Sequence, residues 1–204
     1  HAVDREFRVL RALESSGVPV PRAIHYCDDP SVMGNAFYLM EYVPGHVYLD
    51  PRLPDLSAGV RRRVYESACR LLVALSSVDT VAVGLGDYGR PADYWRRQVR
   101  RWTEQYRASE TQLRPDLEEL IEGLPGAVPV LDEQPSLVHG DFRLDNLIVD
   151  DHGEIRAVLD WELSTLGSPY ADLAYQCAQW RLPESLRGFG DLDRCLDLAA
   201  LGGL

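Results

Sequence analysis

The sequence contains no lysine: all 21 of its basic residues are arginines, and 32 aspartates and glutamates outnumber them, for a net charge of −11. A chain this acidic repels a polyanionic duplex, so we expect no nucleic-acid partner. Any permanently charged side chain that contacts a phosphate in this protein must be an arginine, whose guanidinium binds phosphate oxygens in bidentate fashion.

Clustered cysteines and long apolar runs are also absent. Cys27, Cys69, Cys177 and Cys195 stand far apart with no CxxC pair, so the sequence indicates neither a zinc knuckle nor a dense disulfide framework. No apolar run approaches the ~18 residues that a membrane-spanning helix needs, and the first residues show neither a basic leader nor an apolar signal core. We therefore expect free thiols, no membrane partner and a cytoplasmic location.

The first 43 residues contain the pattern of one helix followed by two strands. Apolar residues at helical spacing predict a helix over 3–13, which Gly17 would end. Strand-like stretches follow at 23–27 and 37–43. Pro44 and Gly45 directly after the second stretch would end that strand.

The remainder of the chain is mostly helical in its periodicity. The predicted helices cover residues 57–78, 91–108, 117–124 and 171–180. In the second of them Tyr94, Val99, Trp102 and Tyr106 fall at helical spacing, and we expect them to face the core rather than to form a stacking surface. The pattern of 188–204 is too ambiguous to assign.

A predicted hairpin interrupts these helices and carries polar residues at both ends. Its strands are 147–149 and 157–159, with Asp141 and Asn146 before the first and Asp160 after the second. A short hairpin returns its end beside its beginning, so Asp160 can reach the same metal ion as Asn146. Phosphoryl transfer needs a carboxylate that accepts the proton of the attacking hydroxyl and oxygen ligands for Mg²⁺, and these three residues are of the right types.

The run HGDFRLDN at 139–146 resembles the catalytic loop HGDxxxxN of the aminoglycoside phosphotransferases and their relatives among the choline, homoserine and macrolide kinases. Asp160-Trp161-Glu162 resembles the family's version of the protein-kinase DFG position. The resemblance implies that Asp141 is the catalytic base and that Asn146 and Asp160 are the Mg²⁺ ligands. It also places Arg143 where protein kinases keep a lysine on the transferred phosphate.

The resemblance extends to the predicted small lobe and beyond the hairpin. It implies that Glu6 pairs with a basic residue that binds the ATP phosphates, that the backbone of Glu41 and Val43 hydrogen-bonds adenine, and that Asp172 braces the catalytic loop. The wording AVDREFRVLRAL at 2–13, together with the catalytic loop, most resembles the kinase-like domains that also occur fused to acyl-CoA dehydrogenases.

The implied fold is an α+β, protein-kinase-like two-lobed fold with an incomplete small lobe. Residues 1–43 would be the remnant of the small lobe, 44–204 the mostly helical catalytic lobe, and the hinge would lie near 41–45. The strands that cover the ATP phosphates are expected before residue 1. The implied activity is Mg²⁺-dependent transfer of the γ-phosphoryl group of ATP to a hydroxyl of a small molecule.

Two alternatives stay open from the sequence. One is a catalytically inactive nucleotide-binding or interaction module of the same fold, and the other is a metal-dependent hydrolase built on His139 and Asp141. The acceptor is also open: an acidic surface suits a cationic acceptor such as an aminoglycoside, whereas the wording of the subfamily indicates hydroxylated acyl compounds.

Overall fold

A computed structural model describes residues 3–128 and 134–181 of the chain. The elements in chain order are α1 (Val3–Leu13), β1 (Ala23–Cys27), α2 (Pro30–Met33), β2 (Phe37–Met40), α3 (Ala58–Ser76), α4 (Tyr94–Ser109), α5 (Pro115–Ala127), β3 (Ser136–Val138), η1 (Leu144–Asn146), β4 (Leu147–Val149), β5 (Ile155–Val158), β6 (Thr165–Gly167) and α6 (Tyr170–Arg181). The unassigned stretch 188–204 lies outside the described residues. None of the described helices has the length and apolar character needed to cross a membrane.

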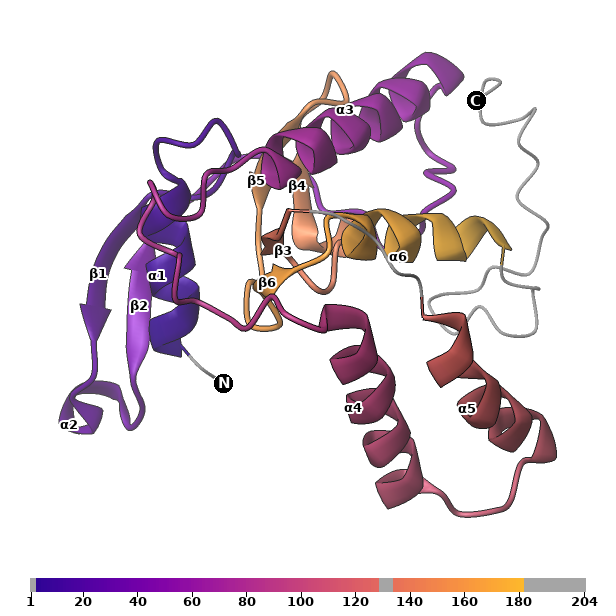
Figure 1. The fold of residues 1–204 in the computed structure, drawn as a ribbon. Coiled ribbons are helices and arrows are strands. Elements are labelled where there is room, and N and C mark those ends of the chain that lie inside the picture. Colours follow the sequence, from indigo (N-terminus) through magenta and orange to yellow (C-terminus); the bar gives the residue numbers. More distant parts are fainter. Residues whose placement is uncertain (1–2, 129–133, 182–204) are drawn as a thin grey trace.

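The N-terminal part pairs β1 with β2 in an antiparallel sheet, and α1 packs against it (Figure 1). The buried side of α1 consists of Val9, Leu10 and Leu13, as its helical spacing predicts. The second strand ends at Met40, so the prediction that it continues to Val43 was wrong. Residues 41–44 have no assigned secondary structure and no partner strand, because β1 begins at Ala23, opposite Met40.

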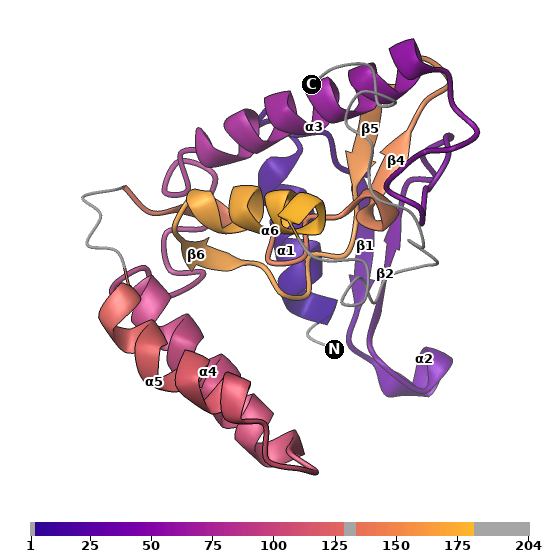
Figure 2. The ribbon, with the colours of Figure 1, turned by 90° about the vertical axis from the view of Figure 1, so that its right-hand side faces the viewer.

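The centre of the molecule is the hairpin of β4 and β5, with Leu147 opposite Val158. Figure 2 shows α3 lying across this region. Ser57 caps the start of α3 through a hydrogen bond from the Val60 amide, and Leu71 on its inner side is buried. One continuous hydrophobic core connects α1, α3 and the hairpin. The predicted hairpin is confirmed, but its second strand spans Ile155–Val158 rather than the predicted 157–159.

A further pairing, between β3 and β6, went unpredicted. Each strand has only three residues, with Leu137 opposite Leu166, and so neither gives a period-two pattern long enough to recognise. Gly167 in β6 lies against the ring of Tyr94: a Cβ at this glycine would lie 2.3 Å from the ring. The close approach of Tyr94 fixes the start of α4 beside β6.

Helices α4 and α5 form an antiparallel pair that projects away from the rest of the chain (Figures 1 and 2). The pair is joined by an ion pair in which Arg107 Nη1 donates to Glu118 Oε1 at 2.9 Å. No residue of α4 is fully buried, and Trp102 is 56% exposed. The prediction that the aromatic residues of α4 belong to the core was therefore wrong. Helical spacing shows which residues share a face but not whether a second layer covers that face.

Candidate active site

The predicted catalytic loop follows β3 and turns sharply at Gly140. This residue has φ of 88°, a left-handed conformation that L side chains rarely adopt. A Cβ at this position would also lie 2.7 Å from the carbonyl oxygen of Leu163. Glycine is therefore required for the loop to pass beneath the segment before β6.

His139 holds the loop from inside. It is completely buried, its Nε2 donates to the Leu159 carbonyl at 2.8 Å, and its Nδ1 accepts from the Asp141 amide at 3.2 Å. Its ring centroid lies 4.7 Å from that of Trp161. Burial lowers the pKa of His139, which keeps the imidazole neutral. Because both ring nitrogens are engaged within the protein, His139 cannot serve as a metal ligand, and this argues against the hydrolase alternative.

Asp172 on α6 braces the same loop, as the sequence predicts. Its carboxylate accepts hydrogen bonds from the backbone amides of His139 at 2.7 Å and Gly140 at 2.8 Å. Burial raises the pKa of Asp172, while the two amide hydrogen bonds lower it. The two donors favour the ionised carboxylate, which ties α6 to the turn before Asp141.

Asp141 lies half-buried at the end of this turn, with polar contacts on several sides. The Asn146 side-chain amide donates to its carboxylate at 3.1 Å and to its backbone carbonyl at 2.9 Å. Arg143 forms ion pairs through Nε to Asp141 at 3.0 Å and through Nη2 to Asp145 at 2.9 Å. Tyr175 on α6 lies near Asp141, and burial, followed by the charge of Asp141, raises the pKa of this tyrosine to about 12.

The two predicted metal ligands lie at adjacent ends of the hairpin. The Leu159 amide donates to the Asn146 carbonyl at 2.9 Å, which places Asp160 next to Asn146. Asp160 is exposed, and its φ of 62° turns the backbone out of the β5 strand. The Asn146 amide nitrogen is used by Asp141, which leaves its Oδ1 for a cation. A carboxylate and an amide oxygen suit Mg²⁺, which often takes only one or two ligands from the protein.

Glu6 on α1 faces this group of carboxylates. It accepts a hydrogen bond from the Tyr38 hydroxyl at 3.0 Å. Burial, followed by the charges of Asp160 and Glu162, raises the pKa of Glu6 against the opposing effect of Tyr38. The structure thus brings Glu6 towards Asp160, while its pairing with a phosphate-binding cation stays a prediction.

The segment predicted to bind adenine lines a cavity of about 350 Å³. Its lining residues are Pro21, Met40, Glu41, Tyr42, Val43, Ile148 and Leu159. The Glu41 amide already donates to the Arg22 carbonyl at 2.9 Å, so Glu41 can offer a ligand its carbonyl oxygen. The mostly apolar lining suits a flat heterocycle, and the roles of Glu41 and Val43 remain predictions.

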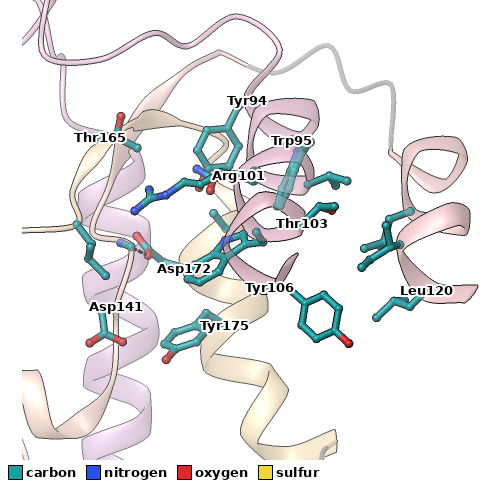
Figure 3. A pocket seen from close by; sticks show the side chains of 18 of the residues that line it. Tyr94, Trp95, Arg101, Thr103, Tyr106, Leu120, Asp141, Thr165, Asp172 and Tyr175 are labelled. Atoms are coloured by element: carbon teal, nitrogen blue, oxygen red, sulfur yellow. Dashed lines mark hydrogen bonds between the residues drawn. The ribbon is translucent and has the colours of Figure 1, made fainter. Parts of the chain in front are cut away.

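A larger cavity, about 660 Å³, opens between α4, α5 and α6. Figure 3 shows Tyr94, Trp95 and Tyr106 on one side of it, Leu120 across from them, and Asp141 with Tyr175 at one end. The four residues that the sequence argument assigned to the core, Tyr94, Val99, Trp102 and Tyr106, all line this cavity. The run of arginines in α4 is the sequence signal that could have distinguished a cavity lining from a core, because it leaves that helix little apolar surface for a buried layer.

A family model described as the phosphotransferase enzyme family matches residues 1–200. The chain belongs to this family. Among curated relatives in the comparison, mouse acyl-CoA dehydrogenase family member 10 is 50% identical over 197 residues, which cover 95% of this chain and 18% of that protein. The chain thus spans about a fifth of the length of this relative.

Solved structures of the phosphotransferase family share the fold. A provisionally named aminoglycoside phosphotransferase of Ralstonia eutropha JMP134 is 45% identical, with a TM-score of 0.89, and the match covers all of this chain and 61% of that one. The streptomycin–ATP complex of the phosphotransferase APH(2″)-IIa is 20% identical with a TM-score of 0.59, over 83% of this chain and 57% of that chain. This family member therefore has the predicted α+β, protein-kinase-like two-lobed fold.

Proposed function

We propose that this chain carries the catalytic site of an ATP-dependent phosphotransferase that moves the γ-phosphoryl group to a hydroxyl of a small molecule. The observation that supports this most is the position of Asp141. Its carboxylate is held by Asn146, next to Asp160, and also lines the large cavity between α4, α5 and α6. A carboxylate so placed faces a metal site and an acceptor site at once.

In the proposed reaction the Asp141 carboxylate accepts the proton of the acceptor hydroxyl as its oxygen bonds to the γ-phosphorus, and the bond between that phosphorus and the β–γ bridging oxygen breaks. Bound ATP would supply the phosphoryl group, and the positive charge of Mg²⁺ would balance the negative charge on the departing ADP. Asn146 and Asp160 would hold the metal. Arg143, already paired with Asp141, would bind oxygens of the transferred group through its guanidinium.

The lining of the large cavity supports an acceptor with an apolar portion. Trp95, Trp102 and Tyr106 face Leu120 and Ile121 across it, and such surfaces gain most from burying hydrocarbon. The mouse relative is named an acyl-CoA dehydrogenase. We therefore favour hydroxylated acyl compounds over polycationic aminoglycosides as acceptors.

The test is Asp141→Asn in the full-length protein, with both ATP affinity and turnover measured on hydroxylated acyl and aminoglycoside acceptors. We expect turnover to fall by about 10²–10⁴-fold, the usual contribution of a general base, while the dissociation constant of Mg·ATP changes little because Asp141 acts on the acceptor. Asp145→Asn is the matched control, since Asp145 lies in the same loop but pairs only with Arg143 among the contacts described. Near-normal turnover of Asp141→Asn would contradict the proposal, and ATP binding without product from any acceptor would favour the inactive nucleotide-binding module.

A further inference from the structure

Another cavity lies beside the large cavity between α4, α5 and α6, which we call the acceptor cavity. We call this further cavity the arginine cavity, because arginines line it. It measures about 400 Å³ and is enclosed by α1, the first half of α4 and the segment that leads into β6. Its charged side chains are Arg5, Arg97, Arg100, Arg101, Glu104 and Glu162. Four cations against two carboxylates stand out in a chain with a net charge of −11, because the charge of the whole molecule would otherwise repel an anion from this face.

Arg5 lies on α1, and the other three arginines come from a run in α4 that places them on one side of the helix. Arg96, Arg97, Arg100 and Arg101 are spaced so that residues four apart lie one above the other. Arg97 and Arg100 also line a neighbouring hollow that contains Arg90 and Arg96. The positive surface therefore continues outward from the cavity.

The contacts of these arginines leave much of their charge uncompensated. Arg5 donates to the carbonyls of Tyr88 and Ser164, both at 3.3 Å, and Arg97 donates to the Ala92 carbonyl. Neutral carbonyls satisfy donors but do not cancel charge. The contact between Arg100 Nε and Glu104 Oε1 is long, at 3.9 Å, and both side chains are 72% exposed, so this pair contributes little.

The arginine cavity adjoins the acceptor cavity. Gln98, Arg101, Leu163 and Thr165 line both. In Figure 3 the Arg101 side chain extends from α4 towards the segment that carries Thr165, on the same side of the helix as Asp141. A ligand that lies along the apolar cavity with one end at Asp141 can therefore place another group among the arginines.

We propose that the arginine cavity binds an anionic group of the phosphate class carried by the acceptor itself, at a distance from the hydroxyl that receives the phosphoryl group. This rests on the proposed function for its account of the hydroxyl, but the anion site is a separate feature of the chain. Guanidinium groups from α1 and α4 suit phosphate oxygens, which accept bidentate hydrogen bonds. The acceptor would then be an amphiphile, with an apolar segment between its hydroxyl and its anionic group.

The experiment compares two probes with the same alkyl chain, a hydroxyalkyl phosphate and the corresponding diol, on the full-length protein. Calorimetry without nucleotide measures binding of each probe and of inorganic phosphate alone. The variant Arg97→Gln/Arg100→Gln removes two charges from the cavity, and Arg62→Gln/Arg114→Gln removes two charges from exposed arginines that pair locally with Glu66 and Asp116.

We expect the wild type to bind the hydroxyalkyl phosphate at least about tenfold more tightly than the diol, the scale of one charge-assisted hydrogen bond. The cavity variant should lose this preference and the control variant should keep it. An equal affinity for both probes, or a preference that survives in the cavity variant, would overturn the proposal. Inorganic phosphate binding as tightly as the probe would also overturn it, since the site would then take a free anion.

Turnover separates this proposal from the proposed function. If the hydroxyalkyl phosphate binds through the arginines and is also phosphorylated in the presence of Mg·ATP, both stand. If it binds in the same way but neither probe nor any other acceptor is phosphorylated, the anion site stands and the proposed function fails.

Discussion

The Asn146 side-chain amide donates to the Asp141 carboxylate at 3.1 Å, so the proposed metal ligand Asn146 also holds the proposed base. The nitrogen end of the amide points to Asp141, and its oxygen end is left for Mg²⁺. Asn146 is also buried, with 9% of its surface exposed, and this limits the positions its amide can take. The two proposed tasks of Asn146 therefore depend on a single orientation of one amide group.

Replacing Asn146 and Asp160 separately should distinguish these tasks. We expect Asp160→Ala to remove Mg²⁺-dependent nucleotide binding, because a carboxylate contributes more to holding a dication than an amide does. Asn146→Ala should weaken Mg·ATP binding less but lower turnover as well, since Asp141 loses its donor. Titration of each variant with Mg·ATP, followed by turnover at saturating Mg·ATP, measures both effects. Equal Mg²⁺ dependence in the wild type and Asp160→Ala would count against the metal site.

The turn at Gly140 provides a stability test with a matched control. Gly140→Ala combines a positive φ with a Cβ 2.7 Å from the Leu163 carbonyl oxygen, and we expect it to lower the free energy of unfolding by about 1–3 kcal/mol. Gly123, within α5, has no atom within 4 Å of an added Cβ. Gly123→Ala should therefore raise stability by about 0.5–1 kcal/mol through helix propensity. Urea unfolding of both variants checks the pair, and a Gly140→Ala protein as stable as the wild type would show that the turn can relax.

The brace at Asp172 should be sensitive to loss of a single acceptor. In Asp172→Asn one oxygen is replaced by an NH₂ group, which cannot accept a hydrogen bond from the backbone amide of His139 or Gly140. We expect a loss of about 1–3 kcal/mol in unfolding free energy, the cost of a buried donor left without its partner, together with reduced turnover. Asp116→Asn weakens an exposed pair with Arg114 and should lower the stability much less. Thermal unfolding of the two variants side by side decides the point; equal losses would mean that Asp172 does not brace the loop.

Replacing Trp102, which lines a cavity, should change acceptor binding, whereas replacing Trp161, which lies in the core, should change stability. Trp102→Ala should raise the KM for an apolar acceptor and leave the KM for ATP and the stability nearly unchanged, since Trp102 is 56% exposed. Trp161 is 1% exposed, and Trp161→Ala should cost about 3–5 kcal/mol of stability. Steady-state kinetics and urea unfolding measure the two effects. An unchanged acceptor KM in Trp102→Ala, with an apolar acceptor known to turn over, would remove α4 from the acceptor site.

The proximity of Asn146 and Asp160, which the sequence predicts, is fixed by local geometry. Asn146 and Asp160 flank a hairpin, and a hairpin of any detailed register returns its ends to one place. The pairing of β3 with β6 and the projection of α4 with α5 depend on contacts between distant segments, which no local period records. For the same reason Tyr175 was not predicted: it belongs to the site only because Asp172, one turn earlier on α6, holds the catalytic loop against that helix.

Helix α6 holds the backbone of the catalytic loop through Asp172, and Tyr175 on the same helix lines the cavity that Asp141 also lines. A ligand that fills this cavity contacts α6, and a shift of α6 would move the loop that carries the base. The base and its loop must then shift together, so their mutual geometry is preserved while their distance from the nucleotide changes. The fit of the acceptor would thus change the distance between the base and the nucleotide, but not the orientation of the base within its loop. Acceptors of different bulk would then differ in rate even when the base is correctly oriented for each of them.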